Sequence, residues 1–272
     1  MENKSLLEEE IFSLQYEMRA LADKAIRNKA ERWIPGFIED VTHKEHLQRY
    51  QFATAFTSGK TVLDIACGSG YGSFILANEG GAKYVDGVDL DAEAIRYGNH
   101  RYPHHNIQRF AANAVNFETD KKYDVIVSFE TIEHVPDYRG LLNNFRHLLT
   151  SEGILLISTP VTRATTLTPL NPFHVIEWSY WDFQNLVNEF FDIRNTVVQN
   201  LILELEKVYP ELSILDRIKF KLKPALRKRY LEKIKHKIIM HGEEMEDFTA
   251  QYKPETIING YQIVVAHKKQ LY

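Results

Sequence analysis

Residues 61–72 read TVLDIACGSGYG, and this stretch decides the fold. Its first half contains a short apolar run with the length of a buried strand: Val62, Leu63, Ile65 and Ala66. Three glycines follow at once, and an apolar helix face begins at Phe74. Glycine adopts positive φ and lets a ligand approach the main chain, and the first turn of a helix leaves backbone N–H groups open to an acceptor. The stretch therefore predicts a strand, a ligand-binding glycine turn and a helix.

A second strand, residues 84–90 (YVDGVDL), ends in Asp89, about 20 residues beyond the turn. An acid at that place suits the hydroxyl groups of an adenosine ribose. A dinucleotide-binding turn would read G-x-G-x-x-G, but Ser73 takes the place of the third glycine. The spacing is instead D-x-x-x-G-x-G-x-G, from Asp64 to Gly72. The pattern therefore favours an adenosine ligand other than a dinucleotide.

This spacing resembles motif I of the class I S-adenosylmethionine (SAM) dependent methyltransferases. The resemblance implies that Gly68 and Gly70 pass under SAM, that Asp64 organises the turn and that Asp89 holds the ribose. It places Asn113 near the adenine amino group, where the family usually has Asp, and an amide oxygen can also accept that hydrogen bond. The other cofactor contacts that it implies are Arg49, near the SAM carboxylate, and Ala66, Leu90, Ala114 and Ser128. For Arg49 the alternative is an ordinary surface charge or core residue.

Strands and helices alternate along the chain, which predicts an α/β, doubly wound, Rossmann-like parallel sheet. Further strands are expected over residues 107–111, 123–129, 154–159, 193–198 and 261–267. The resemblance implies a class I methyltransferase sheet of seven strands with the last one antiparallel. We expect four segments: an N-terminal helical segment (1–30), the SAM-binding core (31–200), a basic helical insertion (201–255) and the last strand of the core (256–272).

The composition is that of a chain with an ordinary hydrophobic core, with 44% hydrophobic and 26% charged residues. Cys67 is the only cysteine, so no internal disulfide can form, and a reducing compartment is expected. Beside the glycines, Cys67 is expected to be a small buried side chain rather than a nucleophile. The first ten residues are acidic, and no run approaches the roughly 20 apolar residues of a membrane span, so we expect a cytoplasmic protein.

Carboxylates and imidazoles gather after two successive strands. Glu130, Glu133 and His134 directly follow the strand over residues 123–129, and His174 follows the next strand in the segment NPFHVIEW. Ligands of open α/β sheets bind at the carboxyl ends of strands, where these groups converge. Two carboxylates and two imidazoles suit a divalent ion such as Mg²⁺, Mn²⁺ or Fe²⁺.

The pattern E-x-x-E-H followed by FHVIEW resembles the small-RNA 2′-O-methyltransferases of plants and bacteria, and its first part is similar to ubiquinone-pathway O-methyltransferases. The first resemblance implies a metal ion, held by Glu130, Glu133, His134 and His174, that binds a vicinal diol and lowers the pKa of its hydroxyl. The alternative is metal-free catalysis with His134 or His174 as general base, because Glu-His after the fourth strand also occurs in methyltransferases without metal.

Apolar residues near the N-terminus step by 4, 3, 4, 3 and 4, which is an a/d seam over nearly three heptads: Leu7, Ile11, Leu14, Met18, Leu21 and Ala25. This helix either pairs with another subunit, giving a homo-oligomer, or packs on its own domain. The sequence leaves both alternatives open.

Residues 217–237 hold ten basic residues and one acid. The rest of the chain then has 23 basic and 36 acidic residues, a net charge of −13. An apolar residue recurs every fourth position from Leu226 to Ile238, which predicts an amphipathic helix. Such a helix attracts phosphates, a nucleotide-sugar, RNA or an anionic membrane surface. The alternative is a solvated lid helix that balances the acidic residues 243–247.

The segments EHLQRY, DIACGSGYG, SFETIEHV, LISTP and NPFHV also resemble bacterial methyltransferases of surface-glycan and nucleotide-sugar biosynthesis. That resemblance implies O-methylation of a sugar or another small polar acceptor. One alternative is an RNA 2′-O-methyltransferase, which the overall acidity disfavours. The other is a SAM-binding scaffold without catalysis that assembles through its N-terminal helix.

Overall fold

The computed structural model describes residues 2–23, 34, 41–203, 221, 223, 246–247, 254 and 257–269. The helix expected over residues 217–237 therefore lies outside the described residues, apart from two isolated positions, and so does Ala25. The chain divides into two compact units. The first comprises Met1–Thr131, Asp137–Leu156 and His267–Tyr272, and the second comprises Ile132–Pro136 and Ile157–Ala266.

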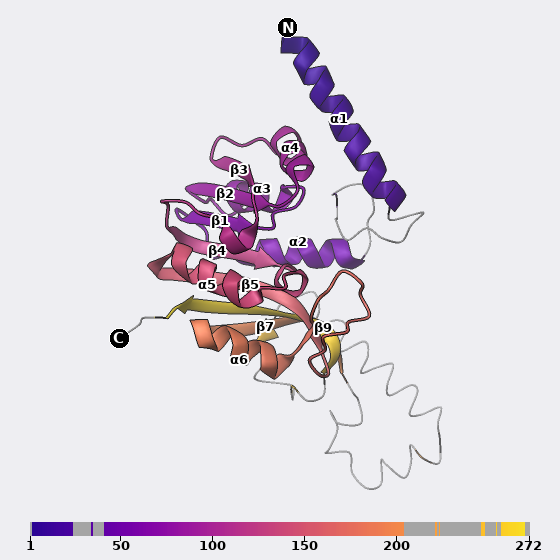
Figure 1. The fold of residues 1–272 in the computed structure, drawn as a ribbon, viewed down its shortest axis with the longest axis vertical. Helices are drawn as coiled ribbons and strands as arrows, with labels where there is room; N and C mark the ends of the chain where they lie inside the picture. The colour runs from indigo at the N-terminus through magenta and orange to yellow at the C-terminus, as the bar shows by residue number, and fades with distance from the viewer. Residues whose placement is uncertain are drawn as a thin grey trace. The chain divides into compact units, whose positions relative to one another are not determined.

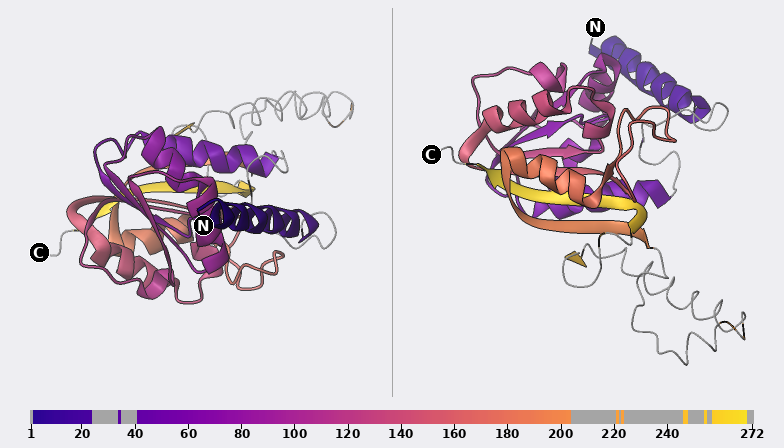
Figure 2. Two further views of the ribbon diagram at one scale, coloured as in Figure 1. Left: turned by 90° about the horizontal axis from the view of Figure 1, so that it is seen from above. Right: turned by 60° about the horizontal axis from the view of Figure 1, so that its bottom comes forward.

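The first unit contains parallel strands and the helices that connect them (Figure 1). Its strands are β1 (Thr61–Ile65), β2 (Tyr84–Asp89), β3 (Ile107–Ala111) and β4 (Tyr123–Phe129). Its helices are α1 (Glu2–Ala22), α2 (Val41–Thr54), α3 (Tyr71–Asn78), α4 (Ala92–Arg101), the short η2 (Ala114–Asn116) and α5 (Tyr138–Leu148). The left view of Figure 2 shows α2 and α5 on opposite sides of these strands. Strands covered on both faces are buried along their length, as residues 62–65 are, and apart from Asp64 these residues are apolar.

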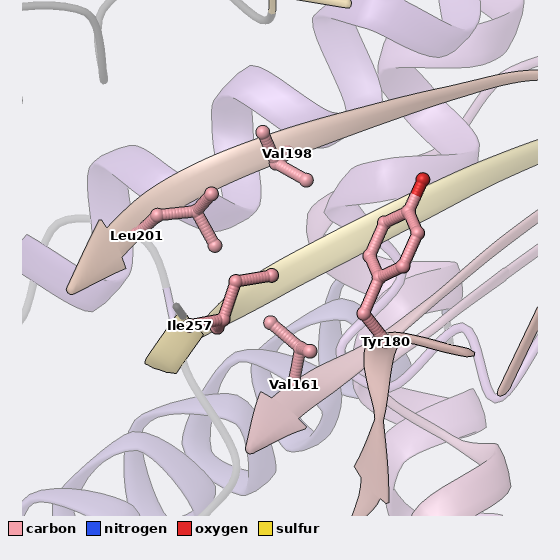
Figure 3. Close-up of a cluster of buried hydrophobic side chains, with 5 residues drawn as sticks. All are labelled: Val161, Tyr180, Val198, Leu201 and Ile257. Carbon is pink, nitrogen blue, oxygen red and sulfur yellow. The ribbon is translucent and has the colours of Figure 1, made fainter. Parts of the chain in front are cut away.

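The second unit begins with the short helix η3 (Ile132–His134). It continues with the later part of β5 (Leu149–Thr162), β6 (Trp178–Ser179), α6 (Tyr180–Phe190), β7 (Phe191–Leu203), β8 (Glu246–Asp247) and most of β9 (Ile257–Lys268). Figure 3 shows a buried apolar cluster of this unit, to which β5, α6, β7 and β9 all contribute: Val161, Tyr180, Val198, Leu201 and Ile257. This cluster holds the ends of three long strands and the start of a helix together.

The strands form one sheet in the order β3-β2-β1-β4-β5-β9-β7-β8, with β6 beside β5. Lys268, near the end of β9, donates to the carbonyl of Leu149 at the start of β5 (2.8 Å), while Ile257 at the other end of β9 packs with Val161 near the end of β5. Strand β9 therefore runs antiparallel to β5. The predicted Rossmann-like sheet with an antiparallel last strand is confirmed, and the two-residue strands β6 and β8 are additions to the seven expected.

Asp91 is the N-cap of α4, because its side chain accepts a hydrogen bond from the N–H of Glu93 (2.8 Å). Strand β5 is longer than the predicted residues 154–159. Among the helices that the structure describes, none combines the length and the apolar character needed to span a bilayer.

Candidate active site

The strand order reverses between β1 and β4 in the first unit, and ligands of open α/β sheets bind at such a switch point. Ile65 at the end of β1 pairs with Val88 of β2 and with Ser128 of β4. The carboxyl ends of these strands therefore share one edge of the sheet. The glycine turn, Asp89 and Ser128, which were predicted from separate stretches, all lie along that edge.

The backbone of the glycine turn is left-handed at three positions: Ala66 (φ 57°), Gly68 (φ 55°) and Gly70 (φ 85°). Gly70 is the N-cap of α3, so the turn leads directly into the helix. A Cβ placed on Gly68 would meet no atom within 4 Å. The space beside Gly68 is thus open, as a ligand that lies against the main chain requires.

Asp89 ties the glycine turn to the end of β2. One carboxylate oxygen accepts from the N–H of Gly68 (2.8 Å), and the other accepts from the N–H of Asp91 (2.9 Å). The side chain of Asp89 is only 8% exposed. The acid that the sequence assigns to the ribose therefore also holds the turn in place.

Asp64 lies fully buried beneath the turn, where both its oxygens accept hydrogen bonds. Tyr50 of α2 donates to one oxygen (3.0 Å), and Ser73 of α3 donates to the other (2.6 Å). Burial raises the pKa of Asp64 to about 6, although the two hydroxyl donors and the charge of Arg109 act in the opposite direction. Asp64 thus connects α2, β1 and α3, in keeping with its predicted role as organiser of the turn.

Replacing Asp64 with asparagine is expected to change the pH dependence of stability. Because the pKa of Asp64 is raised in the folded state, from 3.8 to about 6, the folded chain binds the extra proton between these values. Wild-type stability should therefore fall as pH rises through this window, by up to about 3 kcal/mol, relative to the Asp64→Asn variant. Urea unfolding of both proteins at pH 4 to 7 measures this difference. A difference between wild type and Asp64→Asn that stays constant over this pH range would contradict the prediction.

Arg109 of β3 braces the glycine turn, and this role was not predicted from the sequence. It is 8% exposed, and its guanidinium donates to the carbonyls of Gly70 (3.1 Å) and Tyr102 (3.0 Å). A Cβ on Gly70 would lie 2.7 Å from the Arg109 Nε, so the glycine is needed for this approach as well as for its φ. The sequence IQRFA carries no distinctive signal for this role, although Arg109 is the one buried position of the strand.

The remaining predicted SAM contacts lie in the same unit. Leu90 follows Asp89 and leaves 76% of its side chain exposed, a large apolar group at the tip of β2. Asn113 caps η2 by accepting from the N–H of Val115 (2.9 Å), and the carbonyl of Ala114 accepts from Asn144 (3.0 Å). The Ser128 hydroxyl is buried and has no hydrogen-bond partner among the described residues, and Arg49 is fully buried. Their contacts with a ligand stay predictions.

A second cluster, Glu133, His134 and His174, belongs to the second unit. One potential ligand atom from each of these side chains lies within 4.8 Å of the others. The rings of the two histidines are 4.8 Å apart and nearly perpendicular. The carbonyl of Glu133 accepts from the N–H of Val175 (2.8 Å), which holds the loop that carries His174 against η3. Glu133 itself is buried, and Thr159 donates to its carboxylate (3.1 Å).

In each neutral imidazole, hydrogen bonds fix which ring nitrogen carries the proton. His134 Nδ1 contacts the carbonyl of Phe173 (3.1 Å), which can only accept, so Nδ1 carries the proton and the lone pair is on Nε2. His174 Nδ1 contacts Glu177 (2.7 Å), and its Nε2 accepts from the Asn171 amide (2.9 Å). Glu177 is a second residue that the sequence reasoning did not assign, although its segment was noted.

Three of the four predicted metal ligands thus come together. Glu130 belongs to the first unit, where its backbone is left-handed (φ 51°), and it is not part of the three-residue cluster. Its role as a ligand stays a prediction.

The sheet order with an antiparallel last strand, the glycine turn after β1 and the acid after β2 define the fold of a class I methyltransferase. The sequence pattern of a methyltransferase domain family matches residues 56–200, which is more than half of the chain. The chain belongs to this family.

Among curated proteins, the chain is 32% identical over 174 residues to the "Probable S-adenosylmethionine-dependent methyltransferase" of Mycolicibacterium smegmatis, covering 61% of this chain and 66% of that protein. It is 34% identical over 110 residues to the ubiquinone biosynthesis O-methyltransferase of Glaesserella parasuis, covering 37% of this chain and 45% of that protein. The chain spans about half to two thirds of the length of the first curated relatives that it matches. The N-methyltransferase NodS from Bradyrhizobium japonicum, solved with S-adenosylhomocysteine, has a similar fold, with a TM-score of 0.54 and 15% identity. The match covers 95% of this chain and 99% of NodS.

Proposed function

We propose that the protein is a SAM-dependent methyltransferase that methylates a hydroxyl group of a sugar or nucleotide-sugar. The observation that carries the choice of a hydroxyl acceptor is the cluster of a buried carboxylate with two imidazoles. A sugar hydroxyl is a poor nucleophile and needs a base that takes up its proton or a metal ion that lowers its pKa. The cluster offers imidazoles that can act as the base, and its three side chains are of the kinds that ligate a divalent ion.

The residues of the first unit suit SAM. The open space beside Gly68 accommodates a ligand against the main chain, Asp89 offers a carboxylate to a ribose, and the exposed Leu90 offers an apolar surface to an adenine ring. SAM supplies a methyl group on a positively charged sulfonium, and transfer depends mainly on holding that group in line with the acceptor oxygen.

His134 is the general base in this proposal. The Phe173 carbonyl fixes the proton on Nδ1, so that Nε2 is the atom that accepts the hydroxyl proton. His174, held by Glu177 on one side and by Asn171 on the other, positions the neighbouring ring. These contacts hold both imidazoles in one orientation, which a base needs in order to act on a bound acceptor.

The same cluster fits a divalent ion as the second form of the proposal. One carboxylate and two imidazoles suit Fe²⁺ or Mn²⁺, with Glu133, His134 and His174 as ligands. A bound ion would lower the pKa of a hydroxyl group that coordinates it. In that case Asn171 gives up its hydrogen bond to His174 Nε2, while Glu177 keeps the proton on Nδ1.

The sugar acceptor rests on the resemblance of five segments to surface-glycan methyltransferases. The relative from ubiquinone biosynthesis is named an O-methyltransferase, which supports an oxygen acceptor. The similarity to NodS concerns the fold alone. The RNA alternative was favoured by the diol-type site and by the basic helix. The cluster suits a ribose hydroxyl as well as a sugar hydroxyl, the basic helix lies outside the described residues, and the overall acidity disfavours RNA.

Conversion of SAM to S-adenosylhomocysteine in the presence of candidate acceptors tests the proposal. We expect turnover with nucleoside-diphosphate sugars and a mass increase of one methyl group on the sugar. Single-stranded RNA and primary amines serve as competing acceptors in the same assay. Transfer only to RNA or only to amines would contradict the proposal. A wild-type rate that EDTA abolishes and Mn²⁺ restores selects the metal form, and a rate indifferent to EDTA selects the general base.

A further inference from the structure

Helix α1 of the first unit carries two separate stripes of contact-forming residues. One stripe packs on α4 of the same chain, beside which α1 lies in Figure 1. The other is the heptad seam predicted from the sequence. The structure therefore shows that the helix packs on its own domain, but that it uses a face other than the seam to do so.

Aromatic and charged side chains form the contact with α4. Tyr16 stacks on Tyr97, with the ring centroids 4.7 Å apart. Arg96 makes two hydrogen bonds to Glu9 (both 2.9 Å) and lies 3.9 Å from the centre of the Phe12 ring. Tyr16 is almost fully buried in this contact. The contact holds α1 on the domain and does not involve the residues of the seam.

Two more acids of α1 extend this contact along the flank of the seam. Glu10 accepts from Arg101 (2.8 Å) and contacts His100 (2.9 Å). Glu17 accepts from Arg101 (2.9 Å) and from the Tyr97 hydroxyl (2.9 Å). Their charges are thus paired within the subunit before any partner arrives.

The seam itself faces solvent. Its five described members, from Leu7 to Leu21, leave between 38% and 68% of their surface exposed: Leu7, Ile11, Leu14, Met18 and Leu21. A contiguous apolar row of this kind is unusual on the surface of a monomer and marks an interaction site. Its steps of 4, 3, 4 and 3 are the spacing of a helix that pairs with another helix of the same spacing.

We propose that this seam pairs with the same seam of a second copy, forming a parallel two-stranded coiled coil that makes the protein a homodimer. In the heptad, Ile11 and Met18 occupy a positions and the three leucines occupy d positions. A β-branched residue at a with leucine at d favours parallel two-stranded coils. Ile11 and the three leucines follow this rule, and a second copy presents the same spacing to the seam.

The heptad pattern, not the flanking acids, favours the parallel orientation. Glu10 and Glu17 are paired with Arg101 within the subunit, and Glu17 is only 5% exposed, so neither acid adds a repulsion in either orientation. In the parallel pair the residue across from Glu10 is Gln15 of the second copy, which is uncharged.

The contact with α4 also removes the usual obstacle to so short a coiled coil. A free helix of about 20 residues is only marginally stable, because its ordering costs conformational entropy. Helix α1 is already ordered on the domain, so that cost does not oppose dimer formation. The helix also lies N-terminal to residues 56–200, the part that matches the methyltransferase family, so the pairing is an addition to that domain.

Light scattering with size-exclusion chromatography of the full chain, over a range of micromolar concentrations, tests the proposal. Wild type is expected at twice the mass of one chain, dissociating on dilution. Leu14→Glu with Met18→Glu should give a monomer with unchanged circular dichroism, since both side chains are exposed in the single chain. Leu6→Glu, a substitution of another exposed leucine on the same helix but outside the seam, should leave the dimer intact.

A cysteine cross-link tests the orientation. Cys67 is buried, so a cysteine introduced by Leu14→Cys is the one reactive thiol among the described residues. In the parallel coil the two copies of residue 14 face each other, and mild oxidation should give a covalent dimer; Leu6→Cys should not. A monomeric wild type at all concentrations, a dimer that survives the Leu14→Glu and Met18→Glu pair, or a Leu14→Cys dimer that does not cross-link would each overturn the proposal.

Discussion

Replacing Gly68 with valine is expected to reduce the affinity for SAM by at least about 100-fold, which corresponds to about 2.7 kcal/mol of binding free energy. Gly68 has a left-handed φ of 55° and open space where a side chain would project. A valine side chain would fill the space that the ligand needs, and its branched Cβ disfavours this backbone conformation. Isothermal titration calorimetry with SAM measures the loss directly.

Gly59→Val is a matched control for this substitution. Gly59 lies before β1 in the same unit, has a φ of 70° and also has no atom within 4 Å of a built Cβ. Both variants therefore carry a similar backbone strain, and thermal unfolding should show a similar loss of stability. Only Gly68→Val should lose SAM. Equal SAM affinities for the two variants would show that the turn is not the cofactor site.

Replacing His134 with alanine is expected to lower the rate of methyl transfer by about 10²- to 10⁴-fold, the usual contribution of a general base. The affinity for SAM should not change, because His134 is not among the residues predicted to contact SAM. The measurements are kcat for the sugar acceptor and the SAM dissociation constant from calorimetry. The proposed metal form predicts a similar loss of rate, accompanied by a loss of Mn²⁺ binding.

His147→Ala controls for the removal of an imidazole as such, since His147 is exposed on α5 and its carbonyl, not its ring, accepts from Lys122. This variant should keep the wild-type rate. A His134→Ala enzyme that is as active as wild type would refute the role of His134 in both forms of the proposal. A loss of SAM affinity in the same variant would instead place His134 at the cofactor.

The fold and the glycine turn were predictable because their signals are local. Alternating apolar runs and helix faces, three glycines and an acid at the next strand tip are each contained in a few neighbouring residues. Asp64, Gly68 and Asp89 accordingly stand where the sequence placed them, at one edge of the sheet. The cap that Asp91 forms on α4 is equally local, because its partner is the N–H of Glu93, two residues on.

The residues that brace the site were not predictable, because their partners are far away in the chain. Tyr50 reaches Asp64 from α2, and Arg109 reaches the carbonyl of Gly70 from β3, 39 positions on. Nothing in EHLQRY or IQRFA distinguishes these residues from ordinary core or surface residues. The four metal ligands were predicted from a sequence pattern alone. Of these four residues, the structure brings together Glu133, His134 and His174.

The sequence by itself determined the order of strands and helices, the place of the turn and the heptad spacing of the first helix, because periodicity and glycine act on neighbouring residues. Only the tertiary structure decided which stripe of α1 is buried, and which nitrogen of His134 holds its proton. Both depend on groups that folding brings from elsewhere: the aromatic and basic face of α4 in the first case, and the carbonyl of Phe173 in the second.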